Sequence, residues 1–147
     1  MPQSMQTINI KICTTKQKTS PHQFFILSKG NNAGKPLIQP CANCFVVTCN
    51  DEKKCELLYW LSYALWQSGK CRQHLVGSVI EFLHVRDIRT LLRNAYNSCE
   101  TCPEVYMKFA ETLQFLLKYE ETISAQLEKV RSLKVSIAID VIKNLPV

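Results

Sequence analysis

The stretch from Pro103 to Pro146 constrains the fold of this chain most strongly, because no glycine or proline lies between those two residues. Its apolar residues follow alternating steps of four and three, the heptad pattern of a helix that packs along one side. Glu120 and Lys134 interrupt this seam at core positions. We call the following residues the seam: Phe109, Leu113, Leu116, Ile123, Leu127, Val130, Ile137 and Val141.

Residues 134–142 also fit a second structure. Val135, Ile137, Ile139 and Val141 alternate with polar or small residues, and a period of two is typical of a strand. The absence of a breaking residue favours a helix, and proline is acceptable in the first turn. We therefore predict one helical arm over residues 103–147.

The residues before Pro103 contain three segments that resemble strands. Ile8, Ile10 and Ile12 alternate with polar residues, as in a strand with one solvated face. The apolar blocks at residues 24–27 and 45–47 are short and bounded by turn residues, which is typical of buried strands.

Two segments of the body predict helices. Residues 57–66 are apolar except for Ser62, so we expect a buried central helix, capped by Asn50 and Asp51. Residues 87–98 show the period of an amphipathic helix. Between these helices, residues 74–85 favour a strand that Gly77 bends.

These segments predict an α+β fold, with a small mixed or antiparallel sheet packed on the buried central helix and a long C-terminal helical arm. The α/β body would comprise residues 1–102 and the arm residues 103–147, within one structural domain overall.

The loop from residue 28 to residue 44 is rich in glycine, asparagine and proline, which favour one defined loop shape. It resembles a phosphate-binding P-loop, but its glycine spacing is one residue short and Pro36 replaces the magnesium-binding hydroxyl. We predict instead that the loop contacts phosphates or base edges through Lys29, Asn31, Asn32 and Lys35. The alternative is an ordered turn with solvated lysines.

The charge distribution favours contact with a polyanion. The net charge is +6, and residues 1–40 contain five lysines and no acidic residue. Arg86, Arg89 and Arg93 follow spacings of three and four, so a helix would align them on one ridge. We predict that this ridge binds nucleic acid; a solvated helix face is the alternative interpretation.

Two Cys-x-x-Cys pairs, Cys41 with Cys44 and Cys99 with Cys102, would together complete a four-thiolate zinc site. The gap between the pairs exceeds the spacing of about 15–20 residues in zinc ribbons. A redox role for the second pair is an alternative. The other four cysteines are most simply small core residues. No further cofactor is expected.

The chain offers no recognisable catalytic set. His22, His74 and His84 are scattered without a paired nucleophile, so we predict a protein that is not an enzyme. The N-terminus lacks the apolar core of a signal peptide, and no apolar run reaches about 18 residues. We therefore expect a cytoplasmic protein with no membrane partner.

Two parts of the sequence resemble the specificity subunit of type I restriction-modification systems. The run KYEETISAQLEKVRSLKVSIAIDVIKNL, residues 118–145, is similar to the coiled-coil helix that closes each half of that subunit. The stretch LVGSVIEFLHVRDIRTL, residues 75–91, resembles the late part of a target recognition domain. The loop SKGNNAGKPLIQPCANCFVV, residues 28–47, resembles instead a small uncharacterised family of gut bacterial proteins.

The first resemblance implies an α/β body that reads one half of a bipartite DNA site. It also implies a helix that docks a partner subunit or a second copy. We accordingly expect a non-catalytic DNA-recognition module. The alternative is a protein-interaction or scaffold protein, stabilised by zinc at the four cysteines, in which the heptad arm performs the binding.

Overall fold

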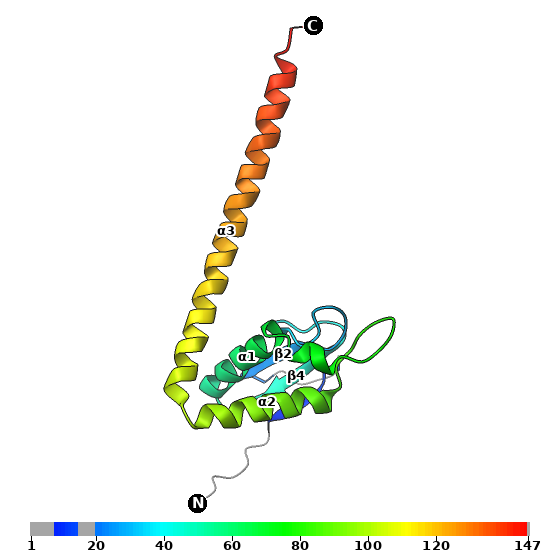
Figure 1. The fold of residues 1–147 in the computed structure, drawn as a ribbon, viewed down its shortest axis with the longest axis vertical. Helices are drawn as coiled ribbons and strands as arrows, with labels where there is room; N and C mark the ends of the chain where they lie inside the picture. Colours follow the sequence, from blue (N-terminus) through cyan, green and yellow to red (C-terminus); the bar gives the residue numbers. More distant parts are fainter. Residues whose placement is uncertain (1–7, 15–19, 147) are drawn as a thin grey trace, which may run out of the picture. The chain divides into compact units, whose positions relative to one another are not determined.

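A computed structural model describes residues 8–14 and 20–146 of the chain (Figure 1). The chain divides into two compact units, Met1–Ala110 and Glu111–Val147. The first unit combines a sheet with helices, and the second unit consists mainly of the continuation of the last helix.

The sheet of the first unit is antiparallel throughout, in the order β1-β4-β2-β3. Its strands are β1 (Asn9–Ile12), β2 (Gln23–Leu27), β3 (Pro36–Leu37) and β4 (Cys44–Thr48). β4 lies at the centre, with its Val47 opposite both Ile10 and Phe24. The three strands predicted from sequence are confirmed. β3 was not predicted, because its two residues lie inside the loop and carry no alternating pattern.

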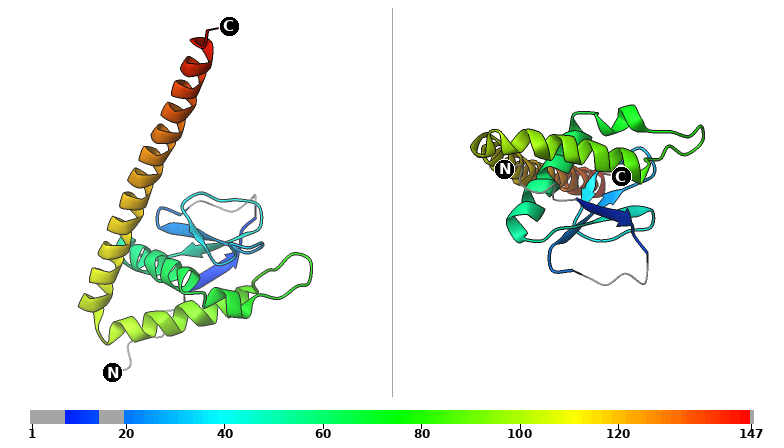
Figure 2. Two further views of the ribbon diagram at one scale, coloured as in Figure 1. Left: turned by 45° about the horizontal axis from the view of Figure 1, so that its top comes forward. Right: turned by 90° about the horizontal axis from the view of Figure 1, so that it is seen from below.

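The two faces of the sheet belong to different apolar clusters. Phe24, Ile26 and Val47 join the main core together with helical residues, whereas Phe25 and Val46 belong to a small second cluster. The alternation follows from the pleat of a strand, which turns successive side chains to opposite faces. Figure 2 shows α1 (Glu52–Gln67) and α2 (Val85–Glu100) side by side against the sheet.

α1 is the predicted central helix, and its start depends on Asp51. The Asp51 side chain accepts a hydrogen bond of 2.8 Å from the backbone amide of Lys54, which satisfies one free amide of the first turn. Leu58 and Leu61 are buried in the main core. The helix ends at Gln67, and Gly69 follows with φ +79°, a conformation that suits glycine.

The prediction of a strand over residues 74–85 is wrong. The structure has instead a short 3-10 helix, η1 (Cys71–His74), and a loop closed by one isolated bridge between Val76 and Phe82. Val79 is 94% exposed and Ile80 is 63% exposed, so these β-branched residues have no core to pack against. Their strand propensity reflects side-chain packing, which this loop does not provide.

The last two helices are α2 and α3 (Pro103–Lys143). Residues 134–142 are helical, as the absence of breaking residues indicated. The predicted boundary before Pro103 coincides with the start of α3, while the division into compact units comes after Ala110. The first turns of α3 belong to the first unit because Tyr106 packs on the main core and Ala110 is buried.

An α+β fold with an antiparallel sheet, a buried central helix and a long C-terminal helix is therefore confirmed.

Candidate functional site

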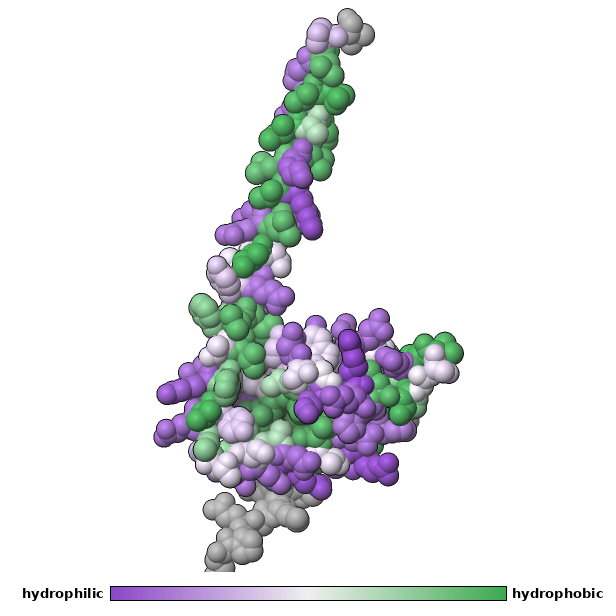
Figure 3. Space-filling view, in the orientation of Figure 1, coloured by the Kyte–Doolittle hydropathy of each residue, from purple (hydrophilic) through white to green (hydrophobic). Residues whose placement is uncertain are grey.

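The first candidate surface is the apolar side of α3. Every residue from Lys118 to Pro146 is exposed. The seam residues Ile123, Leu127, Val130, Ile137 and Val141 are between 47% and 62% exposed. Figure 3 shows hydrophobic residues along this helix up to its C-terminal end. The heptad steps place the seam on one side of a continuous helix, which makes a long apolar stripe.

Apolar residues outside the seam widen this stripe in the last turns of α3. Leu133, Val135, Ile139 and Ile142 are between 47% and 69% exposed. A helix that is apolar over most of its circumference is normally buried. None of the helices among residues 8–14 and 20–146 is both long and apolar enough to cross a membrane. The last turns of α3 thus expose an apolar surface that is wider than the seam alone.

A second surface surrounds the loop between β2 and β4. Asn31 and Asn32 line a cavity of about 330 Å³ together with Trp66 and Arg72. The Lys35 ammonium lies 5.3 Å from the centre of the Trp66 ring, a cation–π distance. Three of the four predicted loop residues therefore meet at one place, beside Trp66 and Arg72, which were not predicted as site residues.

The main chain of Lys29 is not part of that cavity. It forms an isolated bridge with Phe82, and the neighbouring Gly30 amide donates a 2.8 Å hydrogen bond to the carbonyl of Glu81. These contacts attach the loop to the segment before α2. Gly34, with φ +98°, lies against Cys71, where an added Cβ would be 2.6 Å from the Cys71 Cβ. These contacts hold both ends of the turn at residues 30–34 against neighbouring segments of the first unit.

A third surface is a hollow of about 540 Å³ between β1 and α2, which we call the basic hollow. Lys11, Arg89 and Arg93 line it. The Arg89 guanidinium also donates a 2.6 Å hydrogen bond to the carbonyl of Ile10, so this arginine ties α2 to the edge of the sheet. Lys11 was missed as a site residue; its position on the solvated side of an alternating strand is the signal that could have identified it.

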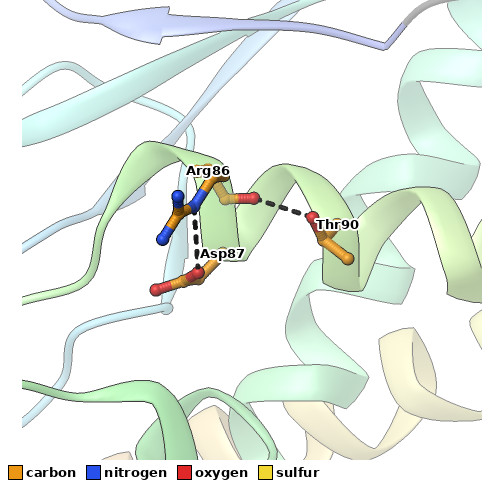
Figure 4. Close-up of polar contacts among 3 residues, drawn as sticks. All are labelled: Arg86, Asp87 and Thr90. Atoms are coloured by element: carbon orange, nitrogen blue, oxygen red, sulfur yellow. Dashed lines mark hydrogen bonds and ion pairs between the residues drawn. The ribbon is translucent and has the colours of Figure 1, made fainter.

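The predicted arginine ridge is only partly one surface. Arg86 does not line the basic hollow. Its side chain is 85% exposed, and its Nε lies 3.9 Å from a carboxylate oxygen of Asp87 (Figure 4). Thr90 donates a hydrogen bond to the Arg86 carbonyl from the next turn. The ridge therefore divides into Arg89 and Arg93 beside β1 and a separate Arg86 at the start of α2.

The four predicted zinc ligands are not brought together. Cys44 belongs to the small cluster on one face of the sheet, whereas Cys99 belongs to the main core on the other face. Cys41 lies beside Cys44, since the Cys44 thiol donates a 3.0 Å hydrogen bond to the Cys41 carbonyl. Cys102 is exposed at the junction of α2 and α3. Across residues 8–14 and 20–146, no three His, Cys, Asp or Glu side chains are grouped to hold a metal ion.

The first cysteine of the second pair also lacks the electrostatics of a redox motif. Burial raises the pKa of the Cys99 thiol to about 11, whereas a reactive cysteine needs a lowered pKa. Burial likewise raises the pKa of Cys71 to about 11. Both thiols are protonated at neutral pH, which suits small core residues.

Comparison with known proteins identifies one family. The model of a family of unknown function, DUF6943, matches residues 10–140. No curated protein and no solved structure matches the chain. The match spans the sheet, α1, α2 and nearly all of α3. The chain therefore belongs to the DUF6943 family.

Proposed function

We propose that this protein is an interaction module whose α3 seam binds a helix of a protein partner. The observation that carries the proposal is the exposure of the seam from Ile123 to Val141 on a helix without breaking residues. Burying one Leu, Ile or Val side chain contributes roughly 1.5–3 kcal/mol. Seam residues covered together would supply a large driving force for association, partly offset by the entropy lost on binding.

The form of the seam specifies the kind of partner. Steps of three and four repeat every seven residues, and this period is the pattern by which helices pack knobs into holes. A groove formed by loops would not require such a regular period. The partner surface would therefore be one or more α-helices that lie along α3.

The proposal is tested by placing charge on the seam and on the opposite side of α3. Leu127→Asp with Val130→Asp disrupts the seam. Ala125→Asp with Ser132→Asp adds the same charge about half a turn away, at exposed positions. In extracts of the native cells, chemical cross-linking and mass spectrometry should find α3 joined to a specific protein or to a second copy. The seam variant should lose these cross-links and the control variant should retain them.

The result that contradicts the proposal is a set of cross-links that is the same for wild type and both variants. Far-UV circular dichroism of each variant checks that the helices persist, since all four positions are exposed and replacing them should not disturb the core.

Binding of DNA is a second candidate function, and the basic hollow favours it. Lys11, Arg89 and Arg93 gather there from β1 and α2, and none of the described residues that line the hollow is acidic. Lysine and arginine displace counterions from a phosphate backbone, and this displacement gives affinity without sequence specificity. A DNA-binding body joined to a docking helix would be the organisation implied by the resemblance to half of a type I specificity subunit.

A further inference from the structure

We infer that the partner of the α3 seam is a second copy of this chain, packed antiparallel to the first. The inference rests on the proposed function, because it specifies which helix the seam binds. It is drawn from Glu120 and Lys134, the two charged residues that occupy core positions of the heptad pattern between the apolar seam residues. Both lie within the exposed part of α3 and are counted with the seam below.

Glu120 and Lys134 occupy the same heptad position. They are fourteen residues apart, which is two heptads or about 21 Å along the helix. Leu127 lies midway between them, seven residues from each. The seam therefore carries opposite charges at equal distances on either side of its centre, a pattern that exchanges its two charges when the helix is reversed.

A parallel pair of α3 helices in register would bring like charges together. In that arrangement each core residue faces the same residue of the other copy. Glu120 would face Glu120 of the second copy, and Lys134 would face Lys134 of the second copy. Both layers would bury two equal charges with no counter-charge in the seam, and this is unfavourable in a partly desolvated interface.

An antiparallel pair brings opposite charges together instead. Two registers close to the centre place apolar seam residues opposite one another, with Leu127 beside either Ile123 or Val130 of the second copy. In both registers Glu120 lies three or four residues, about one helical turn, from the level of Lys134 of the second copy. The long side chains can span this distance, and two-fold symmetry forms the Glu–Lys pair twice.

The residues beside the charged positions favour the same orientation. Tyr119 and Leu133 each precede a charged seam residue and are 57% and 61% exposed. In the register with Leu127 beside Ile123 of the second copy, Tyr119 lies two residues from the level of Leu133 of that copy, so apolar surface meets apolar surface. Parallel pairing would place these two residues beside Ser124 and Ala138 of the second copy. The seam is thus complementary to an antiparallel copy of itself. This complementarity favours a second copy of the chain over a helix of another protein.

Charge exchange tests both the partner and the orientation. The full chain is compared by sedimentation equilibrium with Glu120→Lys, with Lys134→Glu and with the double variant. Antiparallel pairing predicts a wild-type dimer that each single change weakens at least about tenfold, because both Glu–Lys pairs become repulsive. The double variant restores opposite charges and should return to within about threefold of wild type.

Parallel pairing gives a different pattern, since all four proteins would then contain two like-charged layers and dimerise about equally. Raising the salt concentration should weaken the wild-type antiparallel dimer, whose pairs attract, and would strengthen a parallel one. Equal dimerisation of the four proteins, or a wild type that stays monomeric at the highest soluble concentration, overturns the inference. If the protein is a monomer and still forms seam-dependent cross-links to another protein, the inference of a second copy is wrong but the proposed function stands. Loss of all seam-dependent complexes overturns the proposed function as well.

Discussion

At the scale of the residue, Gly34 shows how close contact limits what the loop can contain. Its φ of +98° is rarely adopted by other residues, and an added Cβ would lie 2.6 Å from the Cys71 Cβ and 2.7 Å from its sulfur. Gly34→Ala should therefore lower the free energy of unfolding by about 2–5 kcal/mol, the sum of backbone strain and overpacking. Urea unfolding followed by circular dichroism measures the loss.

Gly30→Ala is the matched control for that change. Gly30 has a similar φ of +86°, but an added Cβ would meet no atom within 4 Å. We expect this variant to lower the free energy of unfolding only by the cost of backbone strain, about 1–2 kcal/mol. Equal losses for the two variants would show that the contact with Cys71 relaxes at no cost.

Arg89 shows a residue whose place on a helix was predicted and whose hydrogen-bond partner was not. Its spacing from Arg93 correctly placed both on one side of a helix. The hydrogen bond to the carbonyl of Ile10 joins residues 79 positions apart in sequence. Helical spacing cannot indicate such a partner, because it depends on how α2 packs against β1.

At the scale of the element, Asn50 and Asp51 are both residue types that favour helix capping, but the start of α1 depends on Asp51 alone. Only Asp51 accepts the hydrogen bond from the Lys54 amide. Asp51→Ala should lower the free energy of unfolding by about 1 kcal/mol, from the lost cap and the lost negative charge at the helix N-terminus. Thermal and urea unfolding measure this change.

Asn50→Ala tests whether the cap is assigned to the correct residue. Asn50 is exposed and lies one position before the cap, so its replacement should change the free energy of unfolding by less than about 0.5 kcal/mol. A larger loss for Asn50→Ala than for Asp51→Ala would contradict the assignment.

Residues 74–85 and 134–142 contain similar β-branched residues and reach different structures. The second segment continues a helix that begins at Pro103, and no residue in between breaks its hydrogen bonds. The first segment follows Gly69 and contains Gly77, whose φ is +111°. Local breakers therefore decided these elements more than side-chain propensity did.

At the scale of the whole molecule, three basic residues from two elements of the first unit gather in the basic hollow. If the basic hollow binds DNA, affinity for a labelled duplex should fall by at least about tenfold between about 50 and 200 mM salt. Lys11→Ala with Arg93→Ala should weaken binding about tenfold at the lower salt concentration. Fluorescence anisotropy measures both effects. Arg89 is left unchanged because it also holds α2 to the sheet.

Lys53→Ala with Lys129→Ala removes the same charge at exposed positions outside the hollow. This control should weaken binding by less than about threefold. An equal effect of the two double variants would assign the attraction to net charge rather than to the basic hollow. No binding at the lower salt concentration would remove DNA as a candidate partner.

The sequence by itself determined the elements whose signals are local. The buried blocks predicted β2 and β4, the apolar run predicted α1, and the uninterrupted heptads predicted α3. These signals are local because a period reflects which face neighbouring side chains share, and a breaking residue acts on backbone hydrogen bonds within a few positions.

Only the tertiary structure decided which side chains meet. It placed Cys44 and Cys99 on opposite faces of the sheet, so the two cysteine pairs do not form one site. It brought Lys11 beside Arg93, and it divided the predicted DNA-binding residues between the loop cavity and the basic hollow. The pairing of strands and the packing of helices join residues far apart in sequence, and no local pattern encodes those contacts.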